Sequence, residues 1–309
     1  MRVVRHVIEY SAVMAVRALV ALLPAGGVRA LGTGLGWLFY TCDARHRRVA
    51  LANVAMCLPS RTAAEREALV RATFRHFGHL LFELLRFSQL TPQARAALVD
   101  VEGAEHVRAA YARGRGVLLF TGHVGFWELQ AIHHGEYFQP MGVLARPLDN
   151  PWLHRLLERT RGATGNHSIY RQGAVRRVLK TLAEGRGVAM LIDQHMHSPD
   201  AIWVQYFERP AATTSTLAAL ALRTGAPVIP AFALPAPGGR YRFVYEAPVM
   251  PPEGDGPEAI HEFTQRCTDV LEMYVRRHPD LWLWMHRRWR DAPVPAPSGD
   301  PGMFPAAQP

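Results

Sequence analysis

The chain of 309 residues is 49% hydrophobic and 20% charged, so it can bury a sizeable core, and no internal repeat indicates a solenoid. The formal net charge of +9 indicates anionic partners, although an arginine-rich composition alone gives the same charge. Cysteines Cys42, Cys57 and Cys267 are odd in number and form no C-x-x-C pair, which argues against a disulfide framework or a cysteine-rich zinc site.

The first 24 residues predict an amphipathic helix whose charged residues fall within about one third of its circumference: Arg2, Arg5, Glu9 and Arg17. Charges inside the apolar run argue against a secretory signal or a spanning helix. Two interpretations remain, a helix lying in a membrane interface and a helix docked on the protein's own core. A second apolar stretch with Trp37 favours the membrane, so we predict that residues 1–40 form a membrane-associating segment.

Residues 62–87 follow helical periodicity, and Thr62 with Glu65 predicts a capping box. Beyond this helix, short apolar runs alternate with helical stretches. The runs are residues 113–123, 185–195 and 224–234, and the helical stretches are residues 127–135, 150–165, 174–185 and 214–225. This alternation predicts an α/β fold, with residues 41–291 forming a single domain around a central mixed, largely parallel sheet flanked by helices.

Residues 238–250 predict a further strand, and residues 260–284 predict a closing helix that ends near Pro279. The Pro- and Ala-rich tail, residues 292–309, is expected to be disordered.

Polar residues follow the apolar runs, and sites in open α/β sheets gather at the carboxyl ends of strands. Three places qualify: His123, the corner formed by Asp193, Gln194 and His195, and the loop expected after Pro230.

Three H-x4-[DE] pairs occur where chance gives about one: His123/Glu128, His195/Asp200 and His286/Asp291. Residues five apart in one helix point about 140° away from each other, so such a pair meets only if the histidine precedes the helix. Glycines on both sides of His123 permit that turn. Glu128 would then hydrogen-bond one imidazole nitrogen and leave the other to accept a proton. The alternative is a histidine packed under a loop, with Glu128 as a solvated helix residue.

Several stretches in order resemble the bacterial lipid A biosynthesis acyltransferases (HtrB-type, lauroyl and myristoyl), relatives of the glycerolipid H-x4-D acyltransferases. They are FTGHVGFWELQA, RPLDNPWLHRLLERTRGATG, LKTLAEGRGVAMLIDQH, VQYFERPAATTSTLAALALRTGAPVIPAF and HPDLWLWMHRRWR. Two positions depart from the family pattern: His195 stands where an acid is usual, and Glu208 where glycine is commoner.

The resemblance implies that His123 is the general base and Glu128 its orienting partner. It also implies substrate-binding roles for Arg161 and Asp193. Arg161 would bind a phosphate or the polarised carbonyl, with an ion pair between helices as the alternative. Asp193 would alternatively be a structural acid at a strand end.

The implied activity is a membrane-associated O-acyltransferase. It moves a fatty acyl chain from an acyl carrier protein or coenzyme A thioester to a hydroxyl of a lipid A precursor or related glycolipid. The implied place is the cytoplasmic face of the bacterial inner membrane, peripheral or monotopic. An anionic lipid is the expected acceptor, and no metal, cofactor or nucleic acid is expected.

Two other functions stay open. Asp193, His195 and His197 resemble part of a metal-dependent hydrolase site. A basic membrane- or RNA-binding protein would also explain the charge, but no RNP-like or helix-turn-helix motif supports it.

Overall fold

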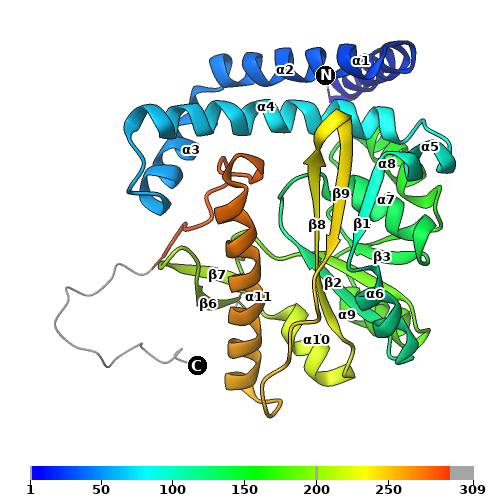
Figure 1. Cartoon of the computed structure of the whole chain (residues 1–309), viewed down its shortest axis with the longest axis vertical. Coiled ribbons are helices and arrows are strands. Elements are labelled where there is room, and N and C mark those ends of the chain that lie inside the picture. The colour runs from blue at the N-terminus through cyan, green and yellow to red at the C-terminus, as the bar shows by residue number, and fades with distance from the viewer. Residues whose placement is uncertain (1, 199–200, 293–309) are drawn as a thin grey trace.

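The computed structural model describes residues 2–198 and 201–292 (Figure 1). Its centre is a seven-stranded sheet of order β1-β9-β8-β2-β5-β3-β4. The strands of this sheet are β1 (Val99–Glu102), β2 (Val117–Thr121), β3 (Met141–Leu144), β4 (His167–Ile169), β5 (Gly187–Leu191), β8 (Val228–Ala236) and β9 (Arg240–Tyr245). Neighbouring strands are parallel except for the antiparallel pair β8 and β9. The predicted mixed, largely parallel sheet is confirmed.

Helices cover both faces of this sheet and form a layer along one edge (Figure 1). They are α1 (Arg2–Leu22), α2 (Ala25–Cys42), α3 (Ala44–Cys57), α4 (Ala63–Phe87), α5 (Pro92–Ala97), α6 (Ala104–Ala112), α7 (Trp127–Tyr137), α8 (Pro151–Gly162), α9 (Ala174–Ala183), α10 (Thr216–Thr224) and α11 (Pro257–Arg277), with 3₁₀ turns η1 (Pro237–Gly239) and η2 (Pro279–Leu281). Thr62 and Glu65 form the predicted capping box of α4.

The core lies on both faces of the sheet because β2 is apolar on both faces. Leu118 and Phe120 pack into one apolar cluster together with residues of α9, α10 and α11, whereas Val117 and Leu119 pack into the other with residues of α6 and α7. Unbroken apolar runs are typical of parallel strands covered on both sides, which is why the runs in the sequence identified β2 and β5.

One strand end was predicted wrongly. No loop follows Pro230, because β8 continues to Ala236 and pairs with β9. A proline removes only its own N–H donor from a strand, and the carbonyl of Pro230 still accepts a hydrogen bond from the Glu246 amide.

A two-stranded hairpin, β6 (Ala201–Gln205) and β7 (Pro210–Thr214), was not predicted. Its turn places Phe207 and Glu208 at φ values of 56° and 59°. Glycine is favoured at such positions, so the tight turn gives a physical reason why glycine is the commoner residue at position 208 in the family pattern.

Helix α2 packs closely on α4 through glycines of both helices. A Cβ atom at Gly36 would lie 2.5 Å from the Cα of Arg75, and one at Gly78 would lie 2.2 Å from the carbonyl oxygen of Gly32. These glycines therefore serve helix packing, which leaves the outer side of α2 free.

Helix α1 buries only His6 and Val20. Apolar side chains are exposed on α1 and α2, among them Val3, Ile8, Leu22, Trp37 and Phe39. Helix α1 also docks on the rest of the chain, because Val20 packs with Phe82 and Leu85 of α4, and Asn150 donates to the carbonyl oxygen of His6. Each of the two interpretations therefore describes one side of this helix. In the part of the chain that the structure describes, no helix is long and apolar enough to cross a membrane. Residues 293–309 of the predicted tail lie outside the described residues.

Candidate active site

The ends of β2 and β5 bring His123 and Asp193 together. The two strands are parallel neighbours in which Thr121 pairs with Leu191, so each side chain stands two residues beyond a paired position. Gly122 permits the close approach, because a Cβ atom there would lie 2.9 Å from Oδ2 of Asp193. The predicted convergence of these two strand ends is confirmed.

The Asp193 carboxylate holds His123 with both of its oxygens. Nδ1 of His123 lies 2.8 Å from Oδ1, and the backbone N–H of His123 donates to Oδ2 at 2.6 Å. The indole N–H of Trp282 also donates to Oδ2, at 2.9 Å. Asp193 is 2% exposed at its side chain. A carboxylate so deep in the protein is stabilised by these donors.

The contact between His123 and Asp193 shifts the pKa of both side chains. Burial would raise the pKa of Asp193, but the charge and hydrogen bonds of His123 and the Trp282 donor hold the pKa at about 2. Burial would lower the pKa of His123, but the charge and hydrogen bond of Asp193 and the charge of Glu128 raise it above its ordinary value. His123 is thus a stronger base than a free imidazole.

The imidazole is poised to accept a proton at its other nitrogen. Since the ionised Asp193 can only accept, it fixes the proton on Nδ1 and leaves Nε2 as the base. The His123 side chain is 21% exposed. Trp127 packs edge-on against the ring, and the side-chain amide of Gln194 lies 3.5 Å from Nε2.

The predicted hydrogen bond between Glu128 and His123 is absent. Glu128 does stand in the first turn of α7, as expected. Its carboxylate instead pairs with Arg161 of α8, through Nε at 3.1 Å and Nη2 at 2.5 Å. The two-pronged guanidinium matches a carboxylate better than a single imidazole nitrogen does, and Asp193 already occupies Nδ1.

Arg161 and Asp193, which we predicted to bind substrate, are both engaged with protein groups. Arg161 also contacts Ser168 at 3.3 Å and Glu158 at 3.7 Å, and its side chain is 9% exposed. The open alternative of an ion pair between helices therefore describes Arg161. Asp193 touches His123 and Trp282.

Sequence reasoning missed the residues that support this pair. Trp282 was recognised only as part of a characteristic ending, and His76 of α4 only as part of a helix. His76 contacts the carbonyl oxygen of Gly125 through Nε2 at 3.1 Å, which ties α4 to the turn that carries His123. Arg288 is buried and donates to the carbonyl oxygen of Ala212 and to the side chain of Thr213.

The predicted metal cluster of Asp193, His195 and His197 is not assembled, because Asp193 faces His123 and Trp282. His195 and His197 instead group with Asp291, with ligand atoms within 4.8 Å of one another. The His195/Asp200 pair cannot be compared, since Asp200 lies outside the described residues. In the His286/Asp291 pair, Nε2 of His286 accepts a hydrogen bond from the backbone N–H of His195 at 3.0 Å.

Comparison with known proteins identifies the family of the chain. The family described as bacterial lipid A biosynthesis acyltransferase matches residues 1–291. The lipid A biosynthesis lauroyltransferase of Escherichia coli is 30% identical over 91% of this chain and 90% of its own length. The palmitoleoyltransferase of the same organism is 26% identical over 85% of each chain. The phosphatidylinositol mannoside acyltransferase of Mycolicibacterium smegmatis is 22% identical over 77% of each chain. The chain therefore belongs to the bacterial lipid A biosynthesis acyltransferase family and is an acyltransferase.

Proposed function

We propose that His123 is the general base of an O-acyl transfer to a hydroxyl of a lipid A precursor or related glycolipid. One observation carries this proposal: the imidazole has one nitrogen bound to a buried carboxylate, while the other lies at the carboxyl ends of the strands with only a 3.5 Å contact to the exposed Gln194 amide among the described residues. The acyl donor is a thioester of acyl carrier protein or coenzyme A.

The reaction follows from these groups. Nε2 of His123 takes the proton of the acceptor hydroxyl, and the oxygen attacks the thioester carbonyl. The C–S bond then breaks, the new ester leaves, and the imidazolium returns its proton to the thiolate. The Gln194 amide, close to Nε2, can donate to the oxyanion that forms in between.

Asp193 is a positioning residue in this scheme, because it fixes the tautomer of His123 and stabilises the imidazolium. Glu128 contributes its negative charge to the pKa of His123. Arg161 holds Glu128 in place and compensates its charge. This replaces the direct dyad of His123 and Glu128 that the spacing suggested.

His123→Gln tests the proposal in the purified full-length protein, with a labelled acyl thioester and a glycolipid acceptor. We expect loss of acyl transfer in a variant that still folds, with a lowered melting temperature because the buried Asp193 loses its imidazole partner. A variant that kept substantial transfer would refute the assignment of His123 as the base.

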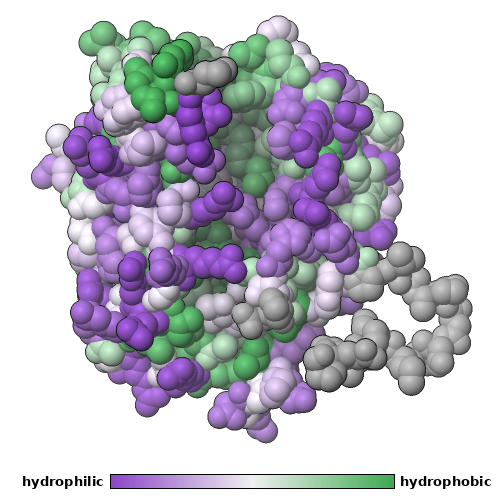
Figure 2. Space-filling view, turned by 180° about the vertical axis from the view of Figure 1, so that it is seen from behind, coloured by the Kyte–Doolittle hydropathy of each residue, from purple (hydrophilic) through white to green (hydrophobic). Residues whose placement is uncertain are grey.

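We also propose that the exposed apolar side chains of α1 and α2 lie in the membrane interface on the cytoplasmic side of the inner membrane. Hydrophobic residues gather along the edge of the molecule where α1 and α2 lie (Figure 2). Trp37 is 67% exposed, and amphipathic aromatic side chains are enriched at such interfaces. Helix α4 packs against α2 and reaches the turn of His123 through His76, so one helix lies between this edge and the site.

Vesicle flotation tests this contact. The double variant Ile8→Ser/Trp37→Ser should bind anionic vesicles more weakly than the wild type. Met250→Ser is the matched control, because Met250 is equally exposed but lies far from α1 and α2 in sequence. Equal losses in both variants would contradict a membrane contact through α1 and α2.

A further inference from the structure

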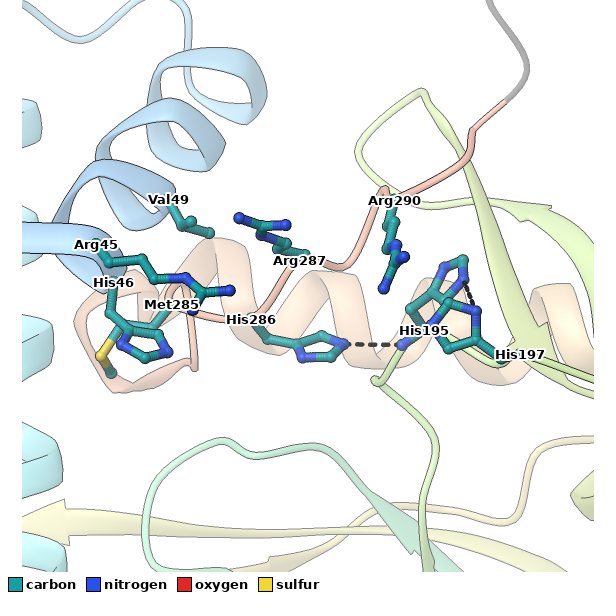
Figure 3. Close-up of a pocket in the computed structure, with 9 residues that line it drawn as sticks. All are labelled: Arg45, His46, Val49, His195, His197, Met285, His286, Arg287 and Arg290. Carbon is teal, nitrogen blue, oxygen red and sulfur yellow. Dashed lines mark hydrogen bonds between the residues drawn. The ribbon is translucent and has the colours of Figure 1, made fainter.

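A cavity of about 230 Å³ lies beside the proposed catalytic pair, many times the roughly 10–15 Å³ that one water needs. Three arginines line it, Arg45 of α3 and Arg287 and Arg290 of the C-terminal segment. Figure 3 shows Arg45 and Arg290 entering from opposite sides. Four histidines complete the polar lining: His46, His195, His197 and His286.

The guanidinium groups have few partners. Within residues 2–198 and 201–292, the side chains of Arg45 and Arg287 make no hydrogen bond or ion pair, and Arg290 has a contact of 3.5 Å with the exposed Asp291. None of the described residues that line the cavity carries a carboxylate. Bringing unpaired cations together costs electrostatic free energy that an anion between them would offset.

The histidines add neutral hydrogen-bond donors. Burial lowers the pKa of His195 and lowers that of His286 to about 4, so both are uncharged at neutral pH. The ring of His286 is fixed, because its Nε2 accepts from the His195 amide. Its Nδ1 therefore carries the proton.

The cavity and the site of His123 lie on either side of the segment that carries Gln194 and His195. Gln194 places its amide 3.5 Å from Nε2 of His123, and the next residue, His195, forms the cavity wall. A substrate anchored in the cavity would extend past this segment to present its reacting group to the base.

We propose that this cavity binds a phosphate ester group of a substrate whose acyl transfer occurs at His123. This inference rests on the proposed function and adds where the substrate is held. Guanidinium groups bind phosphate oxygens in pairs, and three of them face one space here. The phosphate belongs either to the headgroup of the lipid acceptor or to the pantetheine arm of the donor.

The same cavity could instead hold a metal ion, since His195, His197 and Asp291 lie together. The charges favour the anion. A divalent cation would add positive charge next to Arg287 and Arg290, and it would have one exposed carboxylate to compensate it.

Arg45→Gln and Arg287→Gln test the proposal. Both side chains are exposed, so the fold should not change, and the exposed Arg113 at the end of α6 gives the control Arg113→Gln. The acceptor arm compares a phosphorylated glycolipid with the same lipid after phosphatase treatment. The donor arm compares acyl-phosphopantetheine with acyl-pantetheine.

If the acceptor's phosphate is bound, each variant should raise KM for the phosphorylated lipid by about tenfold, on the scale of one charged hydrogen bond. That KM should approach the KM for the dephosphorylated lipid. If the donor's phosphate is bound, the same effect appears in the donor arm. Unchanged KM ratios in both arms, or equal effects of Arg113→Gln, would overturn the inference while leaving acyl transfer by His123 intact.

Direct binding separates this inference from the proposed function. Calorimetry with inorganic pyrophosphate at constant ionic strength should show binding to the wild type that Arg45→Gln and Arg287→Gln weaken by about tenfold. This holds even if the wild type transfers no acyl chain. No pyrophosphate binding, or a bound zinc ion that His197→Gln removes, would overturn the inference.

Discussion

Replacing Asp193 with asparagine removes the charge that faces Nδ1 of His123 and keeps nearly the same side-chain volume. A hydrogen bond to a charged group contributes about 1.5–3 kcal/mol, which corresponds to about 10- to 100-fold in rate. The amide of asparagine can also bind the other imidazole tautomer, a change that costs about 10⁴-fold in serine proteases. We therefore expect kcat to fall between about 10- and 10⁴-fold.

The pH dependence of kcat/KM gives a second, independent measurement. The base form of His123 exists above its pKa, and Asp193 is the main group that raises this pKa. In Asp193→Asn the lowering effect of burial remains while the main raising effect is lost. The acid limb of the profile should then move to lower pH, and its plateau should fall.

The assay is acyl transfer from a labelled thioester to the glycolipid, measured from pH 5 to 9 on variants shown to be folded by thermal unfolding. Glu128→Gln is the comparison, because Glu128 contributes charge but no hydrogen bond to His123. The reasoning is refuted if Asp193→Asn retains nearly full activity. It is also refuted if Glu128→Gln shifts the acid limb further than Asp193→Asn does.

Three further changes test the surroundings of the site. Arg161→Met should lower the free energy of unfolding in urea by about 3–5 kcal/mol, because it leaves the half-buried Glu128 unpaired. If stability were unchanged and KM for the acceptor rose instead, Arg161 would bind substrate. Glu208→Gly should stabilise the chain by roughly 0.5–1 kcal/mol by relieving a positive φ, seen as a higher melting temperature; a lower one would contradict this. Gly125→Ala should cost more than about 2 kcal/mol, because a Cβ atom there would lie 1.9 Å from the carbonyl oxygen of Ala233. Gly114→Ala, also at positive φ but with open space, should cost only about 1 kcal/mol, and equal losses in denaturant unfolding would refute the argument from contact.

The sheet could be predicted because each inner strand is a short apolar run that can be recognised from its own residues. The apolar runs of β2 and β5 need no partner to be recognised, and the polar residues after them mark the strand ends. The prediction at Pro230 was wrong because proline lacks a backbone N–H, and the sequence does not show whether the sheet needs a donor at that position. The hairpin of β6 and β7 was missed because its turn uses Phe207 and Glu208 at positive φ, where no glycine signals the turn.

The proposed catalytic pair could not be predicted from nearby residues in the sequence. Spacing suggested Glu128, five residues from His123, whereas the carboxylate that binds the imidazole is 70 residues away and arrives through the parallel register of β2 and β5. Glu128 is nevertheless close enough for its charge to raise the pKa of His123. An H-x4-E pattern can therefore mark the place of a buried histidine–carboxylate pair even when its own acid makes no hydrogen bond with its histidine. Asp193 supplies the hydrogen bond, Glu128 supplies additional negative charge, and Arg161 prevents that charge from being buried alone.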